Sequence, residues 1–79
     1  MATRRIKLTF PQELIKEPVI FTMAKKFEVM PNIRRARVSE GAGEVVLELE
    51  GSEKSLEAGI EYLKERGVKV DPVEGELFA

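Results

Sequence analysis

Apolar and polar residues alternate cleanly near the start of the chain, in residues 4–10. The two sets occupy opposite faces of that segment: Ile6, Leu8 and Phe10 against Arg5, Lys7 and Thr9. A period of two is typical of a strand with one buried face and one exposed face. Pro11 is expected to end the strand because proline has no backbone N–H to donate to a neighbouring strand.

The apolar spacing changes to a helical period in residues 18–29. Pro18 suits the first helical position, where a missing N–H costs no hydrogen bond. Four apolar residues follow at the spacing of one helix face, which Val19 and Phe21 widen: Ile20, Met23, Ala24 and Phe27. This wide stripe is either a broad core face or a surface that contacts a partner subunit or a ligand. Pro31 prevents the helix from continuing.

Residues 33–39 and 44–50 predict a β-hairpin around residues 40–43, where two glycines supply the permissive backbone of a turn. In its first strand, alternation predicts that Ala36 and Val38 face the core. The same parity places Arg34 at the core-side rim and turns the remaining side chains outward: Ile33, Arg35 and Arg37. In its second strand, the core positions are Val45, Leu47 and Leu49.

A second helix is predicted over residues 52–66. Ser52 is a favourable N-cap, and Gly67 fits the left-handed C-terminal cap. The apolar face consists of Leu56, Gly59, Ile60 and Leu63, with Gly59 allowing a close approach to the sheet. A last short strand begins with Val68 and Val70 and is expected to end at Asp71-Pro72. The remaining residues, to 79, are expected to form a loose tail.

The predicted order of elements is βαββαβ, which is the α+β ferredoxin-like plan. Four antiparallel strands form one sheet in the order 4-1-3-2, and both helices cover one of its faces. We expect residues 1–79 to form a single domain, with an ordered core over about 4–73. At this length a lone core supplies only a few kcal/mol of net stability, so a homodimer is plausible.

The three arginines at positions 34, 35 and 37 pose a question about function. If Val38 pairs with Val45, Arg35 lies opposite Glu48, and Arg35 and Arg37 then form ion pairs with the neighbouring acidic strand. The alternatives are a phosphate or carboxylate site and a nucleic-acid surface. An RNA-binding sheet of this topology presents aromatic residues for base stacking, and none is predicted on the open face.

Composition excludes several classes of function. The 79 residues carry 13 basic and 14 acidic side chains, a net charge of −1, which argues against a strongly basic nucleic-acid module. The chain has no cysteine and no histidine, so thiolate metal sites, disulfides and histidine general bases are excluded. No cofactor is expected. No apolar run is long enough to span a membrane and no signal-peptide pattern opens the chain, so a cytoplasmic location is expected.

The ordered set of these segments resembles a NIL domain over residues 5–73. That family is named for an Asn-Ile-Leu signature at the start of its second strand, and Asn32-Ile33 stands there with Arg34 in place of the leucine. The sequence of the first predicted helix, PVIFTMAKKFEV, is also similar to that of the first helix in the family. The later stretch VVLELEGSEKSLEAGIEYLKERGVKV is similar to the corresponding part of the family.

The resemblance implies an ACT-like regulatory domain that binds a sulfur amino acid, methionine or homocysteine, at a homodimer interface. It implies that the ligand-binding residues are Asn32, Ile33 and Arg34. An asparagine amide has donors and an acceptor that suit a zwitterion, although Asn32 is equally suited to shaping the turn after the helix. Arg34 either swings away from an apolar methionine pocket or pairs with the ligand carboxylate.

Two further hypotheses compete with the sensor. In the first, the protein is an accessory factor of homocysteine synthesis that docks a ferredoxin or a sulfur-transfer enzyme and binds no free ligand. NIL domains also occur in transporter ATPases and fused to ferredoxins, so either protein is a possible partner. The second hypothesis is a small enzyme, and it is disfavoured because no carboxylates are recognisable as a buried pair.

Overall fold

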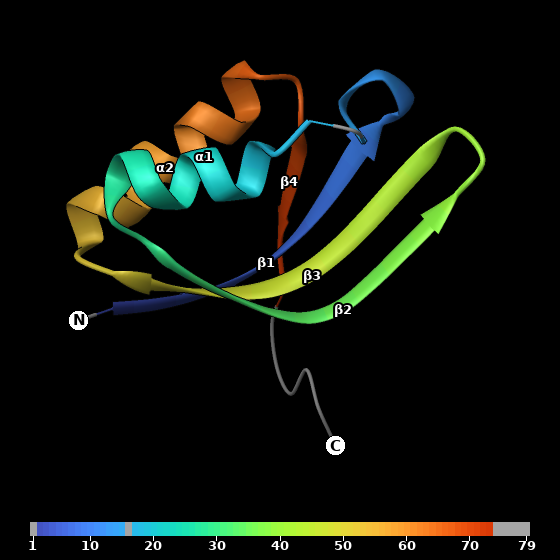
Figure 1. The fold of residues 1–79 in the computed structure, drawn as a ribbon. Helices are drawn as coiled ribbons and strands as arrows, with labels where there is room; N and C mark the ends of the chain where they lie inside the picture. The colour runs from blue at the N-terminus through green and yellow to red at the C-terminus, as the bar shows by residue number, and fades with distance from the viewer. Residues whose placement is uncertain (1, 16, 74–79) are drawn as a thin grey trace.

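The computed structural model describes residues 2–15 and 17–73. Its sheet has the strand order β2-β3-β1-β4, and every neighbouring pair is antiparallel. Both helices lie on one side of the sheet (Figure 1), which confirms the ferredoxin-like α+β prediction. The expected loose tail falls on residues 74–79, outside the described residues. The elements are β1 (Ala2–Pro11), a 3-10 turn η1 (Gln12–Leu14), α1 (Val19–Phe27), β2 (Met30–Ser39), β3 (Ala42–Gly51), α2 (Glu53–Glu65) and β4 (Lys69–Pro72).

The core lies between the sheet and the two helices. Alternation in β1 is confirmed, since Ile6, Leu8 and Phe10 are all buried. The helices and β3 supply most of the remaining core. Burying one such side chain contributes about 1.5–3 kcal/mol. The fully buried large side chains are Leu8, Met23, Leu47, Leu49, Leu56 and Leu63.

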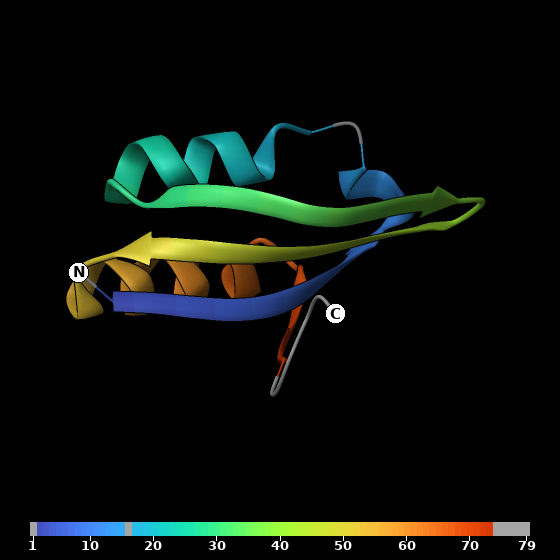
Figure 2. The same ribbon diagram turned by 90° about the horizontal axis from the view of Figure 1, so that it is seen from below.

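The two helices cover different parts of the sheet. Figure 2 shows α2 behind β3 and β1, whereas α1 lies outside the β2 edge. The helices pack against each other, with the rings of Phe27 and Tyr62 5.6 Å apart between centroids. The hairpin of β2 and β3 extends well past α1 in both views (Figures 1 and 2). The far end of the hairpin therefore has neither α-helix above it.

This arrangement corrects the burial predicted for β2. Ala36 and Val38 were expected in the core, but both are exposed, Val38 to 70%. They do lie on the helix-facing side, because Ala36 pairs with Val45 and Val38 with Gly43. They are exposed because the helices stop short of this end of the hairpin.

The pairing of the hairpin also differs from the prediction. The turn is two residues long, Glu40-Gly41, rather than four, because Ser39 already pairs with Ala42. Gly41 makes this tight turn possible with a φ of 87°, a left-handed conformation that costs glycine little. The shorter turn moves Arg35 opposite Val46, so the predicted pairing of Arg35 with Glu48 is wrong.

A β-bulge between Ile33 and Arg35 changes which side chains share a face. Ile33 pairs with Leu47 and therefore lies on the helix-facing side, not on the open face as predicted. Arg34, predicted at the core-side rim, is the extra residue of the bulge, and its side chain is exposed. Bulges of this kind add one residue to a strand and shift the alternation after it.

The predicted ends of α2 are confirmed. The Ser52 hydroxyl accepts a hydrogen bond from the backbone N–H of Ser55 at 3.0 Å, as an N-cap should. Gly67 has a φ of 100° after the helix, in the left-handed region that favours glycine. The last strand begins at Lys69, one residue later than expected, and ends at Pro72.

Gly59 packs closely against Met23 of α1, not against the sheet as predicted. A Cβ at Gly59 would lie 2.9 Å from Sδ of the buried Met23. We expect Gly59→Ala to lower the free energy of unfolding by about 1 kcal/mol, because overpacking of about 1–3 kcal/mol exceeds the gain of about 1 kcal/mol in helix propensity. Urea denaturation measures this change. Adding Met23→Leu removes Sδ and should recover part of the loss; purely additive effects would contradict the contact.

Candidate functional site

The β2 edge is the most open part of the molecule. β2 ends the sheet on one side, and nine of its ten residues are exposed. The outer backbone N–H and C=O groups of an edge strand are available to another chain or to a ligand. Its helix-facing side carries the apolar residues Ile33, Ala36 and Val38, and its open side carries polar and charged residues with the exposed Met30 at one end.

An apolar groove adjoins the far end of this edge. It has a volume of about 240 Å³ and lies between the segment leading into α1 and the β2–β3 hairpin. Two of its side chains, Phe21 and Val38, are exposed to 66% and 70%. The extra apolar width of the first helix therefore faces solvent at Phe21, which favours the interpretation as a contact surface. The lining consists of Phe10, Ile15, Glu17, Pro18, Ile20, Phe21, Val38, Gly43 and Val45.

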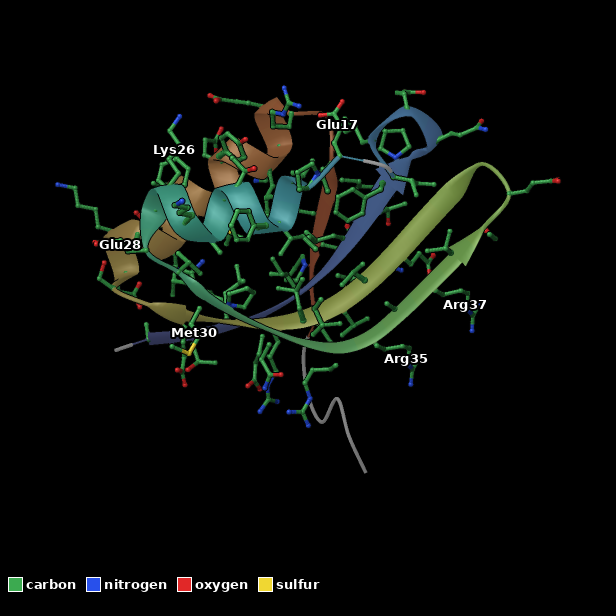
Figure 3. The ribbon with its side chains drawn as sticks, viewed as in Figure 1. Glu17, Lys26, Glu28, Met30, Arg35 and Arg37 are labelled. Atoms are coloured by element: carbon green, nitrogen blue, oxygen red, sulfur yellow. The ribbon has the colours of Figure 1, made fainter. Side chains whose placement is uncertain are left out.

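One carboxylate stands at the margin of this groove. Glu17 is half-exposed, and its Oε1 accepts a hydrogen bond from the guanidinium of Arg66, just after α2 (Figure 3 labels Glu17). The pairing offsets the only charged group among the lining residues. The groove consequently offers an apolar surface to whatever enters it.

The predicted ligand residues lie at the other end of β2. Asn32 lines a hollow of about 220 Å³ on the open face, with Met30, Pro31, Glu48 and Glu50. An amide beside carboxylates is suited to an ammonium group, although Glu48 already accepts a hydrogen bond of 2.9 Å from Nε of Arg5. Ile33 faces the opposite side of the sheet, and Arg34 occupies the bulge. One copy of the chain therefore does not gather the three residues in one hollow.

The groove and the Asn32 hollow are far apart in a single copy. Asn32 and Val38 are six residues apart on an extended strand, a span of about 20 Å. The two sites also open on opposite sides of the sheet. No free amino acid is long enough to reach from one to the other.

Sequence reasoning did not find the groove as a unit. Its lining comes from β1, the segment before α1, α1 itself and the hairpin, which meet only in the fold. The one signal in the sequence was the excess apolar width of the first helix at Phe21. That signal indicated an open surface on the helix, but it did not indicate which other segments line the groove.

Comparison with known proteins identifies the family. The model of the NIL domain matches residues 4–72. The chain belongs to the NIL domain family. The resemblance seen in the segments around Asn32-Ile33 is thereby confirmed.

The curated relatives of this NIL domain are transport ATPases. It is 31% identical over 74 residues to the methionine import ATP-binding protein MetN 2 of Bacillus licheniformis, covering 89% of this chain and 22% of that protein. It is 32% identical over 73 residues to MetN 1 of Listeria monocytogenes serotype 4b, covering 87% and 22%. The chain thus spans about a fifth of the length of these relatives.

Solved structures agree with the fold of this NIL domain. The C-terminal domain of an ABC transporter ATP-binding protein from Enterococcus faecalis superposes with a TM-score of 0.78 at 26% identity, covering 92% of this chain and 86% of that one. Acylphosphatase from Bacillus subtilis superposes with a TM-score of 0.58 at 14% identity, covering 96% and 90%, which shows the fold alone. Within residues 2–15 and 17–73, no helix has the length and apolar character needed to cross a bilayer.

Proposed function

We propose that this NIL domain is a non-catalytic regulatory module that binds a sulfur amino acid, methionine or homocysteine, as a homodimer. The observation that carries the proposal is the apolar groove beside an exposed edge strand in a family whose relatives include methionine importers. A cytoplasmic location and an ATPase partner stay predictions.

The groove is chemically suited to the side chain of such a ligand. A thioether or thiol chain is apolar and polarisable, and its transfer from water to an apolar groove is favourable. The carboxylate and ammonium of the ligand need hydrogen-bond partners, which the groove lining lacks apart from its margin. The edge of β2 and the amide of Asn32 offer such groups, but Asn32 lies at the distant end of the strand.

A second copy of the chain removes the distance along the strand, and the amide of Asn32 then approaches the groove of the partner from the open side of the sheet. If two β2 strands pair antiparallel about a two-fold axis, the Asn32 end of one strand lies near the Val38 end of the other. Such pairing also covers the exposed apolar residues of the edge, Ile33, Ala36 and Val38. We therefore propose a site that is incomplete in one copy and is completed at the interface, with Ile33 and Arg34 near its rim.

Regulation follows from this geometry. A ligand held between two copies stabilises the dimer relative to the monomer. The change in the free energy of dimerisation equals the difference between the ligand's binding free energies for the two states. A partner protein that contacts both copies would sense this change. The domain would thus change the activity of a partner without carrying out any reaction itself.

The direct test is a titration of isotope-labelled protein with L-methionine and L-homocysteine, followed by backbone amide shifts. We expect saturable shifts in residues 17–21, 38–45 and 30–34. An absence of shifts at millimolar ligand would overturn the proposal, since a millimolar dissociation constant corresponds to only about −4 kcal/mol.

Replacing Asn32 tests its predicted role. We expect Asn32→Ala to weaken binding of the amino acid about tenfold or more, because a hydrogen bond to a charged group contributes about 1.5–3 kcal/mol. Folding should be unaffected, since the side chain is exposed. Thr3→Ala, on the same open face of β1, is the matched control and should bind normally. Equal affinity of both variants would remove Asn32 from the site.

A further inference from the structure

A basic hollow lies on the open face of the sheet, opposite the side that carries the helices. We define it by its lining residues, and it has a volume of about 210 Å³. Arg35 and Arg37 come from the edge strand β2 and point away from the helices (Figure 3). Lys7 reaches it from β1, two strands away. The lining residues are Lys7, Arg35, Arg37, Glu44 and Val46.

The pairing of the strands places fewer acids than cations in this part of the open face. Across the sheet, one row runs Arg37, Glu44, Thr9, Lys69, and the next runs Arg35, Val46, Lys7, Asp71. The two rows hold four cations against two carboxylates. Within the described residues, none of the hollow's cations forms a salt bridge, whereas Arg5 and Glu48 in the following row do so at 2.9 Å.

Within the described residues, the ion-pair explanation for Arg35 and Arg37 therefore fails. Arg35 faces Val46 instead of an acid, because the short hairpin turn sets that register. Arg37 is directly opposite Glu44 but makes no salt bridge to it in the described part of the chain. The cations are thus available to an anionic partner without breaking an existing pair.

The surroundings of the hollow select among anionic partners. The open face has no aromatic residue among its described positions, so bases would have no stacking platform. Glu48 and Glu50 lie farther along β3 on the same face and would repel a long polyanion or an anionic lipid surface. A short acidic segment of a protein satisfies the three cations and avoids these two carboxylates.

We propose that the basic hollow docks an acidic segment of a partner protein, with carboxylates at alternate positions of an extended chain. Arg35 and Arg37 are two residues apart on one face of a strand, about 6.6 Å, which is also the spacing of alternate side chains in an extended segment. Lys7 lies about 10 Å across the sheet and binds the flank of the segment. The hollow and the apolar groove occupy opposite sides of the sheet, so docking does not require the amino acid.

The experiment uses the full chain and a nine-residue peptide with aspartates at alternate positions. Binding is followed by backbone amide shifts and by titration calorimetry, with a peptide carrying asparagines at those positions as the control. The test variants are Arg35→Glu/Arg37→Glu and the milder Arg35→Gln/Arg37→Gln, which avoids placing an acid opposite Glu44. The matched control is Lys54→Glu/Lys64→Glu, which changes two exposed lysines on α2 by the same charge.

We expect shifts centred on positions 7, 35, 37, 44 and 46, and a loss of affinity of about tenfold or more in both arginine variants. The lysine variant should bind within about twofold of the unchanged chain. Raising ionic strength from about 0.1 M to about 1 M should weaken binding, because the Debye length falls from about 10 Å to about 3 Å. Binding that does not saturate at millimolar peptide would overturn the proposal. So would arginine variants that bind the peptide as tightly as the unchanged chain does. So would tighter binding to single-stranded DNA or to vesicles containing phosphatidylserine.

Discussion

Leu47→Ala is expected to lower the free energy of unfolding by about 3–5 kcal/mol. Leu47 is fully buried in β3, directly opposite Ile6 on one neighbouring strand and Ile33 on the other. Truncation removes buried apolar surface and leaves a cavity that the surrounding strands fill only in part. A chain of 79 residues has a total stability of about 4–12 kcal/mol, so this loss is a large share of it.

Urea denaturation of Leu47→Ala and of a neighbouring control checks this result. Val46→Ala is the control because Val46 is adjacent in sequence but lies on the open face and is half-buried. We expect that change to cost less than about 1.5 kcal/mol. If both substitutions cost the same, the assignment of the two faces of β3 is wrong.

The second large effect is expected at the β2 edge, where Val38→Glu should abolish assembly and ligand binding but not folding. Val38 is 70% exposed, so the substitution should change the free energy of unfolding by no more than about 0.5 kcal/mol. In the proposed homodimer the new carboxylate would be buried beside the apolar groove without a partner. Each dimer contains the change twice, so the dissociation constant should rise about a hundredfold or more.

Sedimentation velocity measures the assembly, and a methionine titration measures the ligand. Ser39→Glu is the matched control, because it adds the same charge one position away on the other face of the strand. That control should assemble and bind like the unchanged chain. If Val38→Glu still assembles and binds methionine, neither the edge nor the groove belongs to the proposed site.

Parts of the fold that depend on local spacing could be predicted from the sequence. The alternation of Ile6, Leu8 and Phe10 indicates a buried face without any knowledge of the neighbouring strand. Ser52 and Gly67 mark the ends of α2 because their roles depend on the backbone next to them. The order of helices and strands then leaves few possible topologies.

The candidate site was predictable only in part. The signature Asn32-Ile33 indicated the correct strand, and the excess apolar residue Phe21 indicated an open surface. The bulge at Arg34 reverses the faces predicted for Asn32 and Ile33, and no local pattern indicated it. The groove was missed because two stretches distant in sequence, 10–21 and 38–45, form it together.

By itself, the sequence determined which residues of β1 and β3 share a face, where the second helix begins and ends, and the family to which the chain belongs. Only the tertiary structure decided how far the helices extend over the sheet, and therefore that Ala36 and Val38 are exposed. It also decided the hairpin register, which leaves Arg35 opposite Val46. The physical reason is that alternation specifies the side of a strand on which a side chain lies. Whether another element covers that side depends on packing between distant segments.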